Sequence, residues 1–363
     1  MAYNRKQRLN DNIKAIETAF ILDREQRTPT ARERLLLERY CGFGGLKCIL
    51  NPARELADAV HWAKSDLELF APTVELHRLI RENSKNESEY KQLMDSLKQS
   101  VLTAFYTPSA VTEALTDVLK EHQIIPEKVL EPSAGIGAFV GSVLDNNPKA
   151  DIMAFEKDLL TGKILRHLHP EQKVRIEGFE KIEKPFNDYF DLAISNIPFG
   201  DVAVFDPSYT AMKGMRALVT RRIHNYFFVK ALDMVRDGGL VAFITSQGVL
   251  NAKNNSAARF MMLYHADLVS AIRLPNNLFT ENANTEVGSD LIILQKNSQK
   301  ESLRGDDNLL DTVYNDENRI PTNNYFLEHP ERIIHTTAKL DTDPFGKPAM
   351  IYTHEDGVEG IAE

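Results

Sequence analysis

The first hundred residues carry apolar side chains at the three- to four-residue spacing that is typical of helices. Between positions 10 and 22 these side chains fall on one face. Thr30 and Glu33 have the spacing of a capping box, which predicts that a second helix begins before the apolar run at 35–37. Three glycines at 42–45 should end this helix at Gly42, because glycine readily adopts positive φ. Residues 1–100 are therefore predicted to form a helical N-terminal region.

Between 101 and 300 the pattern changes to short apolar runs that alternate with helical segments. Strands are predicted at 129–130, 152–155, 192–194, 240–244 and 291–294. Strands that alternate with helices form a mostly parallel sheet, which binds ligands at the carboxyl ends of its strands. Residues 101–300 are predicted to form a Rossmann-like α/β domain. Residues 301–363 show little periodicity, so we expect a loosely structured, acidic C-terminal extension.

Charge is distributed unevenly along the 363 residues. The net charge is −9, from 43 Lys and Arg against 52 Asp and Glu, yet residues 301–363 alone hold 14 acidic and 5 basic residues. The first 300 residues are thus neutral, and charge does not oppose a nucleic-acid partner. No apolar stretch approaches the roughly 18 residues of a membrane span, and the N-terminus lacks the apolar part of a signal peptide. We expect a cytoplasmic protein with no membrane partner.

A glycine-rich turn follows the strand predicted at 129–130. Gly135 and Gly137 stand where a backbone must approach a ligand closely, at the mouth of a helix. A tight strand-to-helix turn is the simpler alternative. The third glycine of the dinucleotide fingerprint would fall at Val140, and the Lys and Ser or Thr of a P-loop are missing. A nucleoside ligand without a pyrophosphate therefore fits better.

The next predicted strand ends in Glu156, about twenty residues past the glycines. An acidic side chain at this place can accept hydrogen bonds from both hydroxyls of a ribose. A solvent-exposed glutamate at a strand end is the alternative. Taken with the glycine turn, Glu156 indicates an unphosphorylated adenosine, such as that of S-adenosylmethionine.

The apolar strand predicted at 192–194 leads into Asn196-Ile197-Pro198-Phe199. An exocyclic amine on a purine or pyrimidine is a poor nucleophile because its lone pair is delocalised into the ring. If the Asn196 side-chain oxygen and the Ile197 carbonyl both accept the amino hydrogens, the nitrogen can pyramidalise and attack a methyl group. Phe199 would stack on the base. A plain strand and proline turn explains Pro198 but not an asparagine beside a phenylalanine.

Together these motifs resemble the N6-adenine DNA methyltransferases in which the motif near the cofactor's carboxylate precedes the glycine motif, as in modification subunits of type I restriction systems. Here that first motif is residues 104–108. The large methylase-helicase proteins of conjugative and phage-like mobile elements are similar over nearly the whole chain. They resemble it at 27–46, 176–180, 223–228, 242–246 and 324–326. DNA is thus the expected partner, with a specificity subunit or a helicase in trans or in a longer chain.

The resemblance implies an S-adenosylmethionine-dependent methyltransferase domain and assigns its cofactor contacts. Thr107 lies near the methionine carboxylate, Glu156 holds the ribose, and Phe179 or Glu180 contacts the adenine. The remaining cofactor residues lie in the glycine motif, namely Glu131, Ser133, Ala134, Gly135 and Gly137. The sequence departs from the family at Ile197, where proline is usual. Because only the carbonyl of that residue bonds the amine, we expect the chemistry to survive.

A basic stretch follows the catalytic motif. Lys213, Arg216, Arg221 and Arg222 are predicted to contact a phosphate backbone near the flipped base, whereas a solvated helical face is the alternative. His167 and His169 lack carboxylate or cysteine partners at metal-ligand spacing, so we expect surface histidines and no metal.

The resemblance implies methyl transfer from S-adenosylmethionine to adenine N6 in DNA after the base leaves the duplex. Cytosine N4, an RNA adenine and a glutamine side-chain amide are alternative acceptors for the same fold and the same loop. A rival of another class is a non-catalytic DNA-binding or anti-restriction accessory of a mobile element. Binding of S-adenosylmethionine discriminates between the enzyme and the accessory.

Overall fold

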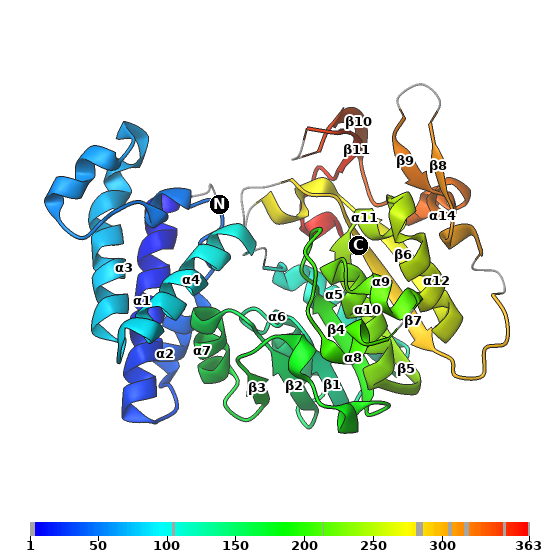
Figure 1. Cartoon of the computed structure of the whole chain (residues 1–363), viewed down its shortest axis with the longest axis horizontal. Helices are drawn as coiled ribbons and strands as arrows, with labels where there is room; N and C mark the ends of the chain where they lie inside the picture. Colours follow the sequence, from blue (N-terminus) through cyan, green and yellow to red (C-terminus); the bar gives the residue numbers. More distant parts are fainter. Residues whose placement is uncertain are drawn as a thin grey trace.

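The computed structural model describes residues 4–103, 106–212, 214–280, 286–303, 307–315, 319–343 and 346–361. A group of N-terminal helices lies beside an α/β unit built on a central sheet (Figure 1). The helical N-terminal region predicted from the sequence is confirmed. Its α-helices are α1 (Arg5–Glu25), α2 (Ala31–Glu38), α3 (Phe70–Glu82) and α4 (Glu87–Thr103), and its 3-10 helices are η1 (Lys47–Leu50), η2 (Leu56–His61) and η3 (Lys64–Leu69).

Local sequence explains where α2 begins. The Thr30 side chain accepts from the Glu33 backbone N–H and the Glu33 carboxylate accepts from that of Thr30, so the predicted capping box is present. The helix ends at Glu38, earlier than the predicted stop at Gly42. Gly42 has a positive φ in the loop that follows, and its carbonyl accepts from the buried Asn12 amide.

The N-terminal region packs on the α/β unit through α7 (Leu159–Leu168). Leu160, Ile164 and Leu168 of this helix belong to the same buried cluster as the apolar faces of α1 and α3. The prediction that His167 and His169 lie at the surface is wrong. Both are buried: His167 Nε2 lies 2.9 Å from Asp23 Oδ1 of α1, whereas the His169 ring lies beside Gly137.

The described residues form a seven-stranded sheet in the order β3-β2-β1-β4-β5-β7-β6 (Figure 1). Strand β7 is antiparallel to β5 and β6, and the other neighbours are parallel. All five predicted strands are present. The strands are β1 (Lys128–Glu131), β2 (Asp151–Phe155), β3 (Lys173–Arg175), β4 (Phe190–Asn196), β5 (Val235–Ser246), β6 (Ala266–Leu274) and β7 (Ser289–Lys296).

Neighbouring residues of the central strands face two different cores. Leu130 packs with α10 (Ile223–Met234) and α12 (Ser256–His265), whereas Val129 packs with α5 (Ser109–Glu121) and α6 (Ala138–Asn146). Helices therefore cover both faces of the sheet, which leaves the carboxyl edge of the parallel strands as the place for a ligand. Short helices follow β4 and β5 at this edge, namely α8 (Pro207–Thr210), α9 (Met215–Val219) and α11 (Gly248–Asn251).

The segment after residue 300 has more structure than its sequence pattern predicts. It contains two antiparallel hairpins, β8 (Thr312–Tyr314) with β9 (Pro321–Asn323) and β10 (Thr337–Thr342) with β11 (Pro348–Thr353), and the helix α14 (Asn324–Glu328). The fully buried Asn323 amide donates to the carbonyls of Leu250 and Leu309 at 2.8 and 2.9 Å. Hydrogen bonds from a buried polar side chain hold a segment in place without the regular spacing of apolar residues that predicts a helix or a strand. No helix in the described part of the chain is both long and apolar enough to cross a membrane.

Candidate active site

The sequence motifs predicted to form the site meet at the carboxyl edge of β1, β2 and β4. Strand β1 lies between β2 and β4, so the ends of the three strands are neighbours. The Ser195 hydroxyl donates to the Ser133 carbonyl at 3.2 Å, and the Ala134 N–H donates to the Phe155 carbonyl at 2.8 Å. The glycine turn is thereby tied to the strands that carry Glu156 and Asn196.

Only glycine fits at the two positions that shape this turn. Gly135 and Gly137 have φ values of +57° and +87°. A Cβ on Gly135 would lie 2.8 Å from Cε1 of Tyr106, and one on Gly137 would lie 2.6 Å from Nε2 of His169. Sequence reasoning missed His169, because only the fold brings α7 under the turn. Tyr106 lies within the motif at 104–108, whose first two residues lie outside the described part of the chain.

Replacing Gly137 with alanine is expected to destabilise the protein. The left-handed conformation alone costs about 1–2 kcal/mol for a residue with a Cβ, and the His169 ring must also move. Gly141→Ala, one turn further along α6, is the matched control because nothing lies within 4 Å of its Cβ. That variant should be about 0.5–1 kcal/mol more stable, as a glycine-to-alanine change in a helix usually is. Denaturant unfolding measures both changes, and equal effects would contradict the role of Gly137.

Two glutamates at the strand ends are held in surroundings that disfavour their charge. Burial, followed by repulsion from Asp158, raises the pKa of Glu156 to about 8. Its carboxylate accepts from the N–H groups of Gly135 and Asp158 at 2.8 and 2.7 Å. Burial also raises the pKa of Glu131, and its Oε2 has no hydrogen-bond partner among the described residues. Hydroxyl and amino groups of a nucleoside could satisfy these oxygens, so this part of the site fits the predicted cofactor.

The raised pKa of Glu156 predicts a pH dependence of stability. In the unfolded chain the group titrates near its ordinary value of 4.5, whereas in the folded protein it titrates near 8. The folded state binds more protons between these values, so Glu156 makes the free energy of unfolding fall as pH rises from about 4.5 to about 8. Glu156→Gln should reduce this fall, measured by denaturant unfolding at pH 5 and pH 8. An unchanged difference between the two pH values would show that the carboxyl is not held in this way.

The loop that carries Asn196 is fixed to the sheet at its first residues. Asn196 is the last residue of β4, and the Ile197 N–H donates to the Ile244 carbonyl of β5 at 3.0 Å. Proline at this position could not make that bond. The Ile197 side chain is 1% exposed and joins the core beneath α10, which explains the departure from proline. Phe199 is half-buried and packs edge-on against Phe279, with ring centroids 6.4 Å apart at 77°.

A model of the family described as N-6 DNA methylase matches residues 88–351. The chain belongs to this family. This membership confirms the predicted resemblance to DNA methyltransferases, and the mostly parallel sheet with helices on both faces confirms the predicted Rossmann-like α/β fold. A protein from Listeria monocytogenes described as a class I S-adenosylmethionine-dependent methyltransferase is similar in structure. It is 15% identical, with a TM-score of 0.47, and the match covers 83% of this chain and 91% of that one.

Two curated proteins are similar to this member of the N-6 DNA methylase family. Defense against restriction protein B of Escherichia phage P1 is 29% identical over 54% of this chain. Type II methyltransferase M.XamI of Xanthomonas campestris pv. amaranthicola is 25% identical over 44% of the chain. The matched regions are 8% and 33% of these two relatives, so the chain spans well under two thirds of either.

The remaining predicted cofactor residues lie around the same edge. Thr107 is buried just before α5. Phe179 begins the 3-10 helix η4 (Phe179–Lys181), and its ring is 1% exposed, edge-on to Phe155 at 5.9 Å. The Glu180 carboxylate lies nearer the surface, 3.6 Å from Lys157 Nζ. Phe179 is therefore part of the core beneath the strand that leads to Glu156, whereas the Glu180 carboxylate lies near the surface.

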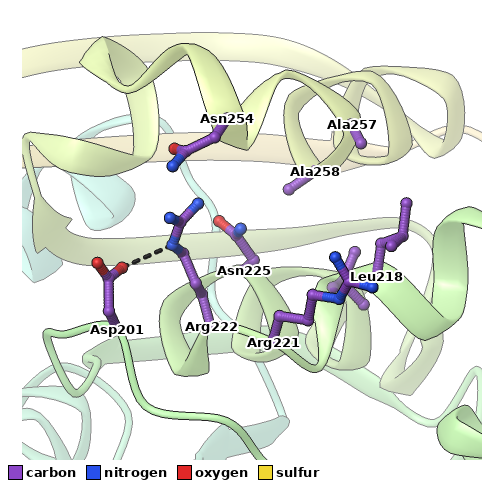
Figure 2. Close-up of a pocket in the computed structure, with 9 residues that line it drawn as sticks. Asp201, Leu218, Arg221, Arg222, Asn225, Asn254, Ala257 and Ala258 are labelled. Carbon is purple, nitrogen blue, oxygen red and sulfur yellow. Dashed lines mark hydrogen bonds and ion pairs between the residues drawn. The ribbon is translucent and has the colours of Figure 1, made fainter.

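The basic residues predicted to contact DNA have different surroundings in the described part of the chain. Arg216 makes two hydrogen bonds to Asp233, at 2.7 and 2.9 Å, and so pairs within the fold. Arg221 and Arg222 instead line a pocket of about 380 Å³ (Figure 2). Lys213 lies outside the described residues. Asn225 and the other polar residues of this pocket were not identified from the sequence, because they lie on separate segments that come together only where α10 and α12 meet.

Proposed function

We propose that the chain transfers a methyl group from S-adenosylmethionine to the N6 amine of adenine in DNA, after the base is extruded from the duplex. The observation that carries the proposal is the Asn196–Phe199 loop, held by β5 at the edge where the glycine turn and Glu156 also lie. Membership of the N-6 DNA methylase family supports the same acceptor.

The cofactor is assigned to the cradle formed by the glycine turn and the neighbouring strand ends. Glu156 would hold the ribose hydroxyls in place of its present bond to Gly135 N–H. Gly135 and Gly137 hold the turn in a left-handed conformation against Tyr106 and His169, which lets the backbone of the turn approach a ligand closely. Thr107, Glu131, Phe179 and Glu180, with Ser133 and Ala134 of the turn, complete the proposed contacts. S-adenosylmethionine supplies an electrophilic methyl group when bound.

The chain's own residues would prepare the amine. The Asn196 side-chain oxygen and the Ile197 carbonyl accept its two hydrogens, which turns the nitrogen lone pair out of conjugation with the ring. Phe199 stacks on the base, and its position is set by Phe279. Catalysis is then mainly orientation and localisation of the lone pair, so a strong general base is not required.

DNA is the proposed partner, contacted at Arg221 and Arg222 beside the catalytic loop. A specificity subunit or a helicase is a further proposed partner. The support is that the matched regions are small parts of the curated relatives, which leaves functions of those proteins to segments outside the match.

The test is a methylation assay with labelled S-adenosylmethionine and duplex DNA of diverse sequence, with and without cell extract. Mass spectrometry of the digested nucleosides should find N6-methyladenine, and activity only with extract would indicate a required partner. Label in cytosine, in RNA or in a protein glutamine would instead identify one of the other acceptors and overturn the proposal. Calorimetry with S-adenosylmethionine separates an enzyme from a non-catalytic accessory, because the accessory reading predicts no binding.

A further inference from the structure

The pocket beside the catalytic loop lies between the first turns of two helices. Arg222 precedes α10, and Ala257 and Ala258 are in the first turn of α12. Neither helix has a side-chain cap or an acidic residue in its first turn. The Ser256 N–H at the start of α12 already donates to the Lys253 carbonyl, but the dipoles of both helices add partial positive charge at their first turns. The pocket therefore suits a negatively charged group.

Two arginines add full positive charge to the pocket. Arg221 is exposed and makes no ion pair within the described part of the chain. Arg222 donates to the Asp201 carboxylate at 2.6 Å and to Asn255 Oδ1 at 2.7 Å (Figure 2 draws the first of these bonds). Asp201 lies two residues after the catalytic loop, and its side chain is 77% exposed. A carboxylate this exposed is easily exchanged for another anion, and arginine binds phosphate in the same way.

Asn225 indicates a second group on the ligand. This residue lines the pocket and is 5% exposed. Its Nδ2 donates to Asn255 Oδ1 at 2.9 Å, whereas its Oδ1 has no hydrogen-bond partner among the described residues. Figure 2 shows the amide pointing into the pocket beside the Arg222 guanidinium. A buried acceptor without a donor is unfavourable, and a ligand N–H would supply the missing hydrogen bond.

We propose that this pocket binds a nucleotide of the DNA next to the target base. The phosphate displaces Asp201 from Arg222 and contacts Arg221 and the start of α12, and the base donates an amino hydrogen to Asn225 Oδ1. A volume of about 380 Å³ lies within the range of small-ligand sites. Asp201 thus occupies the phosphate position until DNA arrives. The proposal rests on the proposed function, since it takes DNA as the substrate, but it concerns binding alone.

The position of the pocket supports this assignment. Strands β4 and β5 both run towards the carboxyl edge, and α10 and α12 begin there before the chain returns to β5 and β6. The pocket therefore opens on the same edge as Asn196. None of its lining residues belongs to the glycine turn or to the strand end of Glu156, so it is separate from the cofactor cradle.

The experiment measures binding of a fluorescent duplex by anisotropy over a series of salt concentrations, with no cofactor. Arg221→Ala should weaken binding about tenfold and lower the slope of log affinity against log salt by about one, because one phosphate contact is lost. Asp201→Asn should tighten binding several-fold, because a competing carboxylate is removed. Lys149→Ala is the control. It removes an exposed charge before β2, at the opposite edge of the sheet.

Affinities of Arg221→Ala and Asp201→Asn within twofold of Lys149→Ala would overturn the proposal. Circular dichroism of each variant verifies folding, and Arg221 and Asp201 are both exposed, so neither change should unfold the chain.

Titration with deoxyadenosine monophosphate identifies the source of the phosphate. Micromolar binding that Arg221→Ala abolishes, with duplex affinity unchanged, would make this a free-nucleotide site and overturn the DNA assignment. If Arg221→Ala and Asp201→Asn change DNA affinity as expected but the protein transfers no methyl group, the proposed reaction is contradicted and the nucleotide pocket is supported.

Discussion

Asn196→Ala is expected to lower the rate of methyl transfer by about 100-fold or more while binding of S-adenosylmethionine is retained. Loss of a single well-oriented polar group at a reacting centre typically costs 10²–10³ in rate. Asn196 is held by the pairing of β4 with β5, and Ile197 continues that pairing through its bond to Ile244. Removal of the side-chain oxygen should therefore leave the loop in place and remove only one of two acceptors for the amine.

Asn196→Asp is the matched variant for this prediction, because it keeps an acceptor oxygen in the same place. It should retain more activity than the alanine variant. Initial rates of labelled methyl incorporation give the loss, and calorimetry gives cofactor affinity for each protein. A rate for Asn196→Ala equal to that of the unmodified protein would exclude Asn196 as the residue that orients the amine.

The motifs of the cofactor and catalytic edge could be predicted because each lies in consecutive residues at a strand end. A parallel sheet then brings the ends of β1, β2 and β4 together, independently of the conformation of the loops that connect them. Two strands of the central sheet escaped prediction for physical reasons. Strand β3 has three residues, and β6 is buried irregularly and interrupted by a register shift between Leu268 and Ser270. Neither produces the apolar alternation that indicates a strand.

Contacts between distant segments could not be read from the sequence. The partner of Arg222 at Asn255 lies 33 positions away, directly before α12. The basic stretch after the catalytic motif suggested contacts to phosphate, but the sequence did not show that Arg216 pairs with Asp233 and Arg222 with Asp201. No acidic residue in the described part of 301–363 pairs with these arginines.

Arg273→Ala is expected to lower the free energy of unfolding by about 3–5 kcal/mol, the usual cost of removing one partner from a buried ion pair. Arg273 of β6 and Asp290 of β7 are paired across the strands, with bonds of 2.9 and 3.1 Å. Their side chains are 2% and 0% exposed. Without Arg273 the Asp290 carboxyl must be buried alone or become protonated, since burial already raises its pKa.

The same guanidinium connects the C-terminal segment to the sheet, so the loss should extend beyond one pair. It lies 4.1 Å from the centre of the Phe326 ring and donates to Asn251 Oδ1, which also accepts from the Asn323 N–H.

Arg78→Ala is the control, because Arg78 pairs with glutamates on an exposed helix face and its loss should change stability by less than about 1 kcal/mol. Denaturant unfolding compares the two variants. The double variant Arg273→Met with Asp290→Leu should be more stable than Arg273→Ala alone, because no charge is left buried. If all three proteins unfold at the same denaturant concentration, burial does not decide the strength of this pair, and the C-terminal segment must be held by Asn323 and its neighbours instead.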